Sequence, residues 1–234
     1  MKQIASSTAP RMADAHPLPD YLRRTYAWAY LDARTLPWLD RPPVVSAILW
    51  GNAGVLMRAA VGEFEPGQSV LQAACVYGDF SRMLARRVGA NGRLEVVDVA
   101  PIQVSNARDK LAALPQAMTR VGDLTQPLSR QYQGVCCFFL LHEVPPGQRR
   151  MIVDNLLAAV MPGGKVVFVD YHRPVPWHPL APIMSLIFRA LEPYAPSLLD
   201  TPIESMSPRA AEFQWTRRTR FGGLYQHVVG TRQA

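Results

Sequence analysis

The feature that most constrains the fold is an alternation of two hydrophobic patterns from residue 69 onward. Continuous apolar runs of strand length alternate with longer segments whose apolar residues recur at helical spacing. A run that is apolar at every position is typical of a strand buried on both faces, as in a parallel sheet covered by helices. The alternation therefore predicts an α/β fold built on a mostly parallel sheet of seven strands.

The expected strands cover residues 69–76, 93–98, 118–122, 134–141 and 165–170, and two more flank Gly222 and Gly223 within residues 213–229. The expected helices between them cover residues 80–88, 101–114 and 147–160. The 234 residues fit one such domain with additions.

Two additions depart from this rhythm. Residues 1–15 are small and polar and are expected to be disordered, while residues 16–66 are expected to form an N-terminal helical cap on the α/β domain of residues 67–234. Residues 174–208 are rich in proline and apolar side chains, and we interpret them as an insertion with a short helix over residues 179–191.

The cap is expected to hold two helices. Asp20 is placed to cap a helix over residues 21–31. A second helix is expected to begin at Pro42 and Pro43, because proline is tolerated in a first turn, and to end before Pro66-Gly67.

Composition limits the classes of function. The net charge is +7, but the arginines are scattered and no nucleic-acid motif is present, so nucleic acid is not an expected partner. No spanning helix and no export signal are expected, and a cytoplasmic location at the inner face of the membrane suits the charge best. The cysteines Cys75, Cys136 and Cys137 are expected to be reduced thiols in core strands.

Polar residues stand at the ends of the first three expected strands, where doubly wound sheets bind their ligands. Gly78 supplies the turn glycine after the first strand. Asp98 ends the second strand, where a carboxylate can accept both hydroxyls of a ribose, and Val99 can pack on an adenine face. Asp123 and Leu124 follow the third strand, where a carboxylate can receive an adenine amino group.

The remaining strand ends carry two further polar pairs. His142 and Glu143 end the fourth strand and read as a metal ligand or a general base, or equally as ordinary loop residues. Asp170 and His172 are two residues apart, so both can face the same way in an extended chain. With Glu143 or Asp79 they would form an oxygen–nitrogen site suited to manganese, the alternative being separate solvated side chains.

In this order the glycine turn, the acidic strand end, Gly-Asp, Leu-His and Pro-Gly-Gly resemble the class I methyltransferases over residues 68–172. The alternative is a nicotinamide-type Rossmann domain or a bare α/β scaffold. The resemblance implies a Rossmann-like fold that binds S-adenosyl-L-methionine through residues of this order. On this basis the expected cofactor-binding residues are Tyr77, Gly78, Asp79, Asp98, Val99, Asp123 and Leu124.

The chain departs from that family around the glycine turn. Gln72 stands where the family usually has an acidic residue, and Ala74 and Val76 stand where it usually has glycine. Val76 and Tyr77 intrude where the methionine half of the cofactor would lie. We therefore expect the amino-acid end of the cofactor to be held differently.

A narrower resemblance fits these departures from the family pattern. Residues 21–30, 40–43, 75–81 and 170–174 resemble the rhodoquinone biosynthesis methyltransferase-like family. This resemblance implies conversion of ubiquinone to rhodoquinone, in which an amino group replaces a ring methoxy group. It further implies that S-adenosyl-L-methionine donates the nitrogen and that a divalent metal such as manganese takes part.

The altered turn suits such a donor, because a nitrogen donor needs its amine, rather than its methyl group, aimed at the acceptor. Tyr77, with His142, Glu143 and Tyr26, forms the expected catalytic set. Tyr26 and Tyr30 lie on one helical face and can roof the cofactor pocket, or the helix can simply pack on the sheet, while Trp28 is expected to point elsewhere.

The insertion offers either a cover for the core or an apolar entry for an isoprenoid tail, with docking on a membrane. Three functions therefore stay open: quinone amination, conventional methylation of a quinone or another lipophilic acceptor, and a non-catalytic interaction protein. Retention of Asp98, Asp123 and Gly163-Gly164 disfavours the third.

Overall fold

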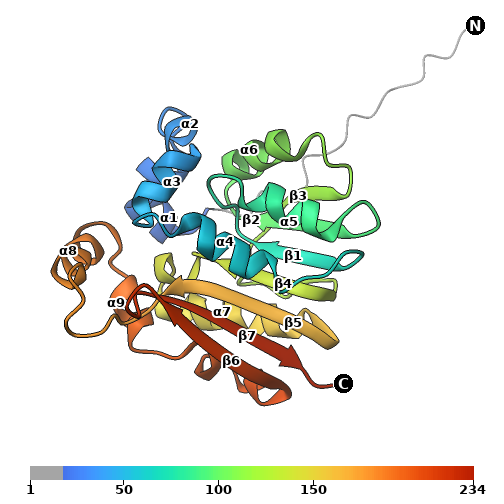
Figure 1. Cartoon of the computed structure of the whole chain (residues 1–234). Helices are drawn as coiled ribbons and strands as arrows, with labels where there is room; N and C mark the ends of the chain where they lie inside the picture. The colour runs from blue at the N-terminus through green and yellow to red at the C-terminus, as the bar shows by residue number, and fades with distance from the viewer. Residues whose placement is uncertain (1–17) are drawn as a thin grey trace, which may run out of the picture.

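The computed structural model describes residues 18–234 (Figure 1). One sheet of seven strands, ordered β3-β2-β1-β4-β5-β7-β6, forms its centre. The strands are β1 (Ser69–Ala73), β2 (Arg93–Asp98), β3 (Ala117–Val121), β4 (Tyr132–Phe138), β5 (Val160–Tyr171), β6 (Phe213–Arg220) and β7 (Tyr225–Arg232). The strands β1 to β5 pair in parallel, and β7 is antiparallel to both of its neighbours. The predicted seven-stranded, mostly parallel α/β fold is confirmed.

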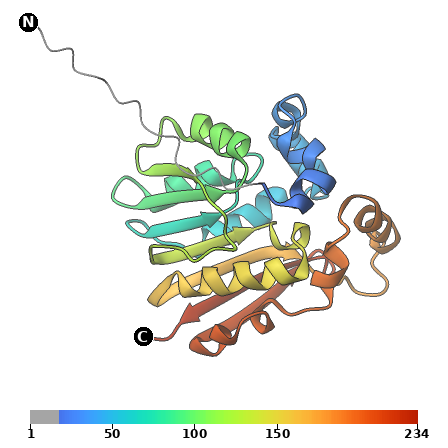
Figure 2. The ribbon, with the colours of Figure 1, turned by 180° about the vertical axis from the view of Figure 1, so that it is seen from behind.

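Helices cover both faces of this sheet. The helices α4 (Ala53–Val61), α5 (Phe80–Val88) and α6 (Pro101–Leu111) lie on one face, and α7 (Pro146–Ala158) covers the other, as Figures 1 and 2 show. Two apolar cores result, one on each side of the sheet. The central strands are buried along their length, which is why they read as continuous apolar runs.

The N-terminal cap contains α1 (Asp20–Thr25), the π-helical turn η1 (Ala27–Leu31), α2 (Leu36–Leu39) and α3 (Pro42–Ile48). The predicted cap by Asp20 is wrong by one residue, because Asp20 is already helical and Pro19 precedes the helix. The prediction of one helix after Pro42 is also wrong. Trp50 and Gly51 have φ angles of 50° and 77°, so the backbone turns and α3 and α4 meet at 99°.

Other predicted bounds need smaller corrections. The helix predicted over residues 21–31 is split into α1 and η1, and β5 begins before Gly163-Gly164 rather than after it. The predicted disorder of residues 1–15 lies outside the described residues. No single helix in residues 18–234 is long and apolar enough to cross a membrane, although α3 and α4 would reach that length and composition as a bent pair.

The insertion forms α8 (Ala181–Leu191), α9 (Ala195–Leu199) and two short 3-10 turns, Ile203–Ser205 and Pro208–Glu212. In Figure 1 the cap and α8 lie beyond the same edge of the sheet, the one at which the parallel strands end. Cys136 and Cys137 are buried in β4 as expected, whereas Cys75 lies after β1 and is only partly buried. The insertion and the cap thus face the edge where a ligand is expected.

Candidate active site

A first cavity opens where β1, β2 and β3 end. The predicted residues Asp98, Val99, Asp123 and Leu124 all line it, so the structure brings together this part of the predicted site. Asp98 is buried, and its carboxylate accepts the backbone N–H groups of Cys75 at 2.7 Å and Ala100 at 2.8 Å. Burial raises the pKa of Asp98, and these hydrogen bonds oppose the rise.

The glycine turn after β1 faces the cap rather than this cavity. Gly78 has a φ of 76°, and its N–H donates to Asp40 Oδ1 at 2.8 Å. Lys110 Nζ lies 2.7 Å from the same oxygen and also donates to the carbonyl of Val76. The side chains of Asp40 and Lys110 are almost fully buried. A side chain of the cap therefore occupies the turn amide that could otherwise meet a ligand.

The predicted cofactor contacts of Gly78 and Asp79 are not supported by their positions. Neither residue lines the first cavity, because Asp40 takes the Gly78 amide and Asp79 pairs with Arg82 at 3.0 Å. Asp79 is half-exposed and also lies away from the other expected metal ligands. The turn contributes to the site through the residues that precede Gly78.

Tyr77 lies in a second cavity and not in the first. Its hydroxyl donates to the carbonyl of Ala29 and accepts from Gln103 Nε2 at 3.0 Å. Its ring stacks on Tyr30, with centroids 5.6 Å apart and planes inclined by 13°. Tyr77 therefore joins the cap to the glycine turn and places a flat aromatic wall in the second cavity.

Gln72 and Ala74 shape the turn from beneath. Ala74 has a φ of 68°, a left-handed conformation that favours glycine. Gln72 is fully buried and donates to the carbonyl of Ala74 at 2.9 Å, while its Oε1 finds no partner among the described residues. Ala74 thus adopts a conformation that favours glycine, the residue that the resembled family usually has at this position.

The second cavity has a volume of about 480 Å³ and lies between the cap, the strand ends and α8. Its walls are mostly apolar, with contributions from Val45, Leu49, Met184, Ile187 and Tyr171. Trp28 also lines it, so the prediction that this side chain points elsewhere is wrong: the π-helical turn rotates it toward the mouth.

The two cavities share four lining residues, which are Tyr30, Cys75, Phe139 and Glu143. A ligand in the first cavity and a ligand in the second would therefore meet at these side chains. Glu143 is the only carboxylate among the four, so any proton that moves at this junction has one obvious acceptor.

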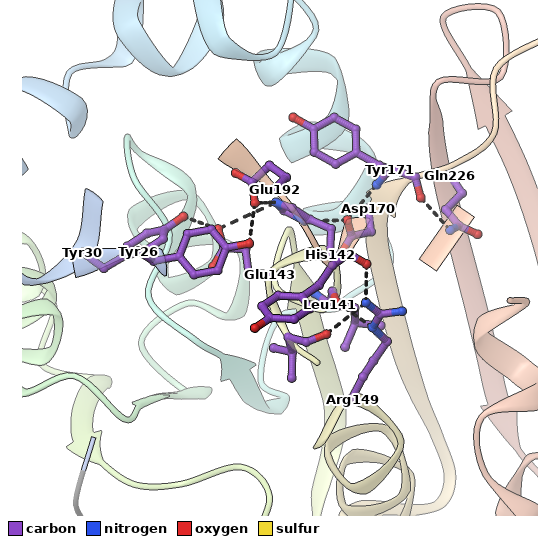
Figure 3. Close-up of polar contacts among 12 residues, drawn as sticks. Tyr26, Tyr30, Leu141, His142, Glu143, Arg149, Asp170, Tyr171, Glu192 and Gln226 are labelled. Atoms are coloured by element: carbon purple, nitrogen blue, oxygen red, sulfur yellow. Dashed lines mark hydrogen bonds and ion pairs between the residues drawn. The ribbon is translucent and has the colours of Figure 1, made fainter. Parts of the chain in front are cut away.

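A polar cluster lies beside the junction (Figure 3). His142 Nδ1 is 2.8 Å from Asp170 Oδ1, and its Nε2 is 3.7 Å from Glu143 Oε1 and 4.0 Å from Glu192 Oε2. Asp170 also accepts hydrogen bonds from the backbone N–H groups of Leu141 and Tyr171. Asp170 is thereby held behind the imidazole and orients it.

Two phenols from the cap close this cluster. Tyr26 donates to Glu192 Oε2 at 2.8 Å, and Tyr30 donates to Glu143 Oε1. Burial and the nearby carboxylates raise the pKa values of both phenols, which keeps them protonated as donors. The predicted site residue Tyr26 is thus at the second cavity, buried and directed at a carboxylate.

Burial and charge shift the acidities of the cluster in opposite ways. Burial alone lowers the pKa of His142, but Asp170, Glu192 and Glu143 outweigh it and raise the value to about 9. Burial raises the pKa of Glu143 to about 8, opposed by His142, and it also raises that of Glu192. The cluster thus concentrates acidic groups around one imidazole, a composition that favours a bound cation.

The structure does not bring together the predicted metal ligands Asp170, His172 and Glu143. The ring of His172 bonds a backbone carbonyl in the turn between β6 and β7, and Asp170 is engaged by His142. Among the described residues, His142, Glu143 and Glu192 instead place one ligand atom each within 4.8 Å of one another. One nitrogen and two carboxylate donors fit a hard or borderline divalent cation such as manganese.

Sequence reasoning missed two residues of this site. Glu192 ends α8 inside the insertion, and the only signal was a lone carboxylate after an apolar helix. Arg149 is buried in α7, and it donates to the carbonyls of Leu141, Val144 and Tyr194 at 2.7 to 2.9 Å. It therefore fastens the segment that carries His142 and Glu143, although its sequence neighbours suggested only a surface charge.

The fold is shared with solved methyltransferases. A solved O-methyltransferase family protein from Burkholderia thailandensis superposes with a TM-score of 0.65 at 15% identity, over 87% of this chain and 61% of that one. The N-methyltransferase NodS of Bradyrhizobium japonicum, solved with S-adenosyl-L-homocysteine, gives 0.57 at 16% identity, over 86% and 94%. At these identities the likeness establishes the fold, which is that of the methyltransferases.

Sequence comparisons find similarity to methyltransferases over part of the chain. Residues 70–164 match the family model of a methyltransferase domain. The chain is 32% identical over 117 residues to a 2-phytyl-1,4-naphtoquinone methyltransferase of Thermosynechococcus vestitus, covering 48% of this chain and 50% of the relative. It is 30% identical over 135 residues to the ubiquinone/menaquinone biosynthesis C-methyltransferase UbiE of Bordetella parapertussis, covering 56% and 49%.

The chain spans about half the length of these curated relatives. Within that span, residues 70–164 are similar to a methyltransferase domain.

Proposed function

We propose that this chain converts ubiquinone to rhodoquinone by replacing a ring methoxy group with an amino group, and that S-adenosyl-L-methionine supplies the nitrogen. The observation that carries the proposal is the meeting of two cavities of different character at Tyr30, Cys75, Phe139 and Glu143. The cofactor occupies the first cavity and the quinone the second. The amine of the donor and the ring carbon of the acceptor then meet beside Glu143.

The first cavity suits the adenosine half of the cofactor. Asp98 lies where a carboxylate can accept the ribose hydroxyls, and Asp123 lies where one can receive the adenine amino group. Val99 and Leu124 supply apolar walls for the flat base. Relatives of the same domain family are named as methyltransferases, and NodS was solved with the demethylated cofactor, which supports the same ligand here.

The region of the glycine turn suits a donor of nitrogen. Asp40 accepts the hydrogen bond that the Gly78 amide donates, and Tyr77 stacks on Tyr30 beside the junction. Gln72 cannot hold an amine as an anion would, and it is buried beneath the turn. The amino group of the cofactor would therefore be free of the usual clamp, in a cavity that Glu143 also lines.

The second cavity suits a quinone with an isoprenoid tail. Tyr77, Phe139 and Tyr171 give aromatic walls for a planar ring, and the side chains of α3 and α8 give an apolar channel for the tail. A ligand pocket of this kind combines apolar walls with a few polar groups that fix orientation. Here those polar groups are Glu143 and Glu192.

The first half of the reaction is an addition followed by an elimination. The amine nitrogen forms a bond to the ring carbon that carries the methoxy group, and the carbon–oxygen bond then breaks. Glu143 takes the proton from the nitrogen and returns it to the leaving methoxide, so that methanol departs. In a later step the α-carbon of the donor loses its proton and an electron pair passes through the nitrogen to the quinone ring, which is reduced to the hydroquinone while the nitrogen–carbon bond becomes an imine. Water then hydrolyses the imine, so the amino group stays on the ring and the donor leaves as its α-keto acid, and dioxygen reoxidises the aminohydroquinone to the aminoquinone.

A divalent metal, manganese in this proposal, fits the donor set of His142, Glu143 and Glu192. When bound there it supplies Lewis acidity toward a quinone carbonyl. A carboxylate has two oxygens, so Glu143 can contact the cation with one and take the amine proton with the other. Asp170 fixes the tautomer of His142 from behind, as partners of metal-binding imidazoles usually do.

The second candidate function is conventional methyl transfer to a quinone or another lipophilic acceptor. The names of two relatives favour it, because both are quinone methyltransferases. The same cavities would serve it, with the methyl group instead of the amine facing the acceptor.

Labelled cofactor separates the two functions. The full chain is incubated with short-tailed ubiquinone, with and without manganese, and with S-adenosyl-L-methionine carrying ¹⁵N in its amino group. Mass analysis is expected to find a quinone that has lost a methoxy group and gained ¹⁵N. A quinone that has gained a methyl group without ¹⁵N would overturn amination in favour of methylation.

Variants of the turn check the reasoning about the donor. Tyr77→Phe and, separately, Val76→Gly are expected to lower the yield of aminoquinone, because each alters the wall that directs the amine. Unchanged yields with both variants would contradict the role assigned to the turn.

A further inference from the structure

The mouth of the second cavity is apolar and open to solvent. Trp28, Ile48, Trp50 and Leu191 all line the cavity, and each leaves 36% to 49% of its surface exposed. They come from the cap and from the end of α8, two parts of the chain far apart in sequence. Large apolar side chains that gather around one opening mark a site of contact with an apolar partner.

The helix α8 carries large apolar side chains on its inner side and also on its solvent-exposed side. Its inner side packs Met184, Ile187 and Phe188 against the cavity and the core. Its outer side presents Ile183 and Leu186 to solvent, and Leu186 is 66% exposed. Large apolar side chains on a helix are normally buried in a protein or in a membrane, and those of the outer side of α8 are left exposed by the described residues.

One contact joins the two parts of the mouth. Trp50 Nε1 donates to Met184 Sδ at 3.3 Å, which links the turn after α3 to the inner side of α8. Trp177, which is 81% exposed, lies just before α8. We name Trp28, Ile48, Trp50, Trp177, Ile183, Leu186 and Leu191 together the mouth face.

Exposed arginines lie in the same parts of the chain as this face. Arg34 and Arg41 lie in the cap beside α2 and α3, and Arg189 lies on α8. All three are exposed, and no carboxylate within the described residues 18–234 forms an ion pair with them. Each such cation near an anionic bilayer contributes on the order of 1 kcal/mol to binding, and tryptophan is the side chain that favours the interface between lipid and water.

We propose that the mouth face docks on an anionic lipid bilayer at the cytoplasmic side, with the mouth of the second cavity turned toward the acyl chains. Aromatic and aliphatic side chains around the mouth enter the interface, and the arginines contact the lipid headgroups. That an isoprenoid-tailed substrate enters directly from the lipid rests on the proposed function, whereas the docking itself does not.

Vesicle sedimentation tests the docking with the full chain and without any quinone. Wild-type protein is mixed with phosphatidylcholine vesicles that contain roughly one third phosphatidylglycerol, and with vesicles of phosphatidylcholine alone. The triple variant Trp177→Ser, Ile183→Ser, Leu186→Ser removes part of the mouth face and no residue that lines the cavity. We expect about tenfold weaker binding of this variant to the anionic vesicles, and weaker wild-type binding to the neutral ones.

A matched control replaces Met118, Met151 and Met161 by serine, because these methionines are also exposed but lie on other elements. This control is expected to bind as wild type does. Equal sedimentation of the Trp177, Ile183, Leu186 variant and wild type would overturn the proposal. So would a wild-type dimer that the triple variant converts to monomer without any binding to vesicles, since the face would then join two copies.

Activity on a short-tailed, water-soluble quinone keeps the two proposals apart. The triple variant is expected to retain that activity while it loses vesicle binding. Vesicle binding without any quinone chemistry in the wild type would reject the proposed function and leave the docking standing.

Discussion

At the scale of single residues, the turn after β1 holds an alanine in a left-handed backbone conformation that favours glycine. Ala74 has a φ of 68°, which for a residue with a Cβ is unfavourable by about 1 kcal/mol. Its N–H donates to Val97 and its carbonyl accepts from Gln72, so both neighbours hold it in place. The conformation therefore belongs to the fold, and the alanine is the departure.

Ala74→Gly is therefore expected to stabilise the protein by about 1 kcal/mol, because glycine adopts a positive φ without strain. Urea unfolding measures the change. The adjacent Ala73→Gly serves as a control, since Ala73 is buried in the regular strand β1 and its replacement should destabilise by about 1 kcal/mol or more. A loss of stability in Ala74→Gly would contradict this account of the turn.

Arg149 is the second such residue, because its guanidinium hydrogen-bonds to backbone carbonyls. It is 2% exposed, and its guanidinium serves three carbonyls and the hydroxyl of Ser197. These bonds join the His142–Glu143 segment to α9 of the insertion. A buried carbonyl left without a donor is costly, so the loss of several at once should be large.

Arg149→Met is expected to lower the free energy of unfolding by about 3 kcal/mol, because it keeps apolar volume but leaves the carbonyls unpaired. Thermal and urea unfolding give the measurement. Arg150→Met is the matched control, since Arg150 is the exposed neighbour on the same helix and should change stability by less than about 0.5 kcal/mol. Equal effects of the two substitutions would argue against the clamp.

At the scale of elements, one buried ion pair fastens the cap to the α/β domain. Asp40, at the end of α2, accepts from Gly78, Lys110 and Asn106. The removal of one partner from a buried pair leaves an uncompensated charge, which is strongly destabilising. The cap is therefore held over the glycine turn by charge as well as by apolar packing.

Asp40→Ala is expected to loosen the cap locally. Amide hydrogen exchange over residues 36–48 should become faster by tenfold or more, while exchange in β4 and β5 stays slow. Asp20→Ala removes an exposed pair with Arg23 and should leave exchange in residues 36–48 unchanged. Exchange that rises equally throughout the molecule would mean that the cap is not an independent unit.

At the scale of the whole molecule, the site is assembled from three parts of the chain. The α/β domain contributes His142 and Glu143, the cap contributes Tyr26 and Tyr30, and the insertion contributes Glu192. Among residues 18–234, the three donor residues for a cation come together where the domain and the insertion meet.

Manganese binding should therefore depend on the insertion. Glu192→Gln is expected to weaken manganese affinity by about tenfold or more, and to reduce the rise in melting temperature that the metal causes. Calorimetric titration and thermal unfolding supply the two readouts. Glu204→Gln, in the insertion but paired with Arg217 at the surface, should bind manganese as wild type does, and a matching loss there would refute the assignment.

Much of the architecture could be predicted because its signals are local. The helix over residues 80–88 and the strand over residues 93–98 were predicted to the residue, since each carries its own period between breaking residues. The bend between α3 and α4 could not be predicted, because tryptophan is not a residue type that favours the left-handed backbone conformation found at Trp50.

The candidate site, like the architecture, could be predicted only in part. Asp98, Asp123 and their apolar neighbours were predicted together because parallel strands end at one edge of a sheet, wherever they lie in sequence. Gly78 and Asp79 were predicted to contact the cofactor but do not line the first cavity, and nothing in their neighbourhood signals that Asp40 would accept the Gly78 amide. His172 does not lie with the other expected ligands, because its ring hydrogen-bonds to a backbone carbonyl in the turn between β6 and β7.

The sequence by itself determined the mostly parallel seven-stranded sheet and the edge at which its parallel strands end, because hydrophobic period and chain direction are properties of neighbouring residues. Only the tertiary structure decided that the cap fills the glycine turn and that two cavities meet at Glu143. Tertiary structure alone also added Glu192 to His142. Those contacts depend on how segments more than thirty residues apart pack, and no local pattern records that packing.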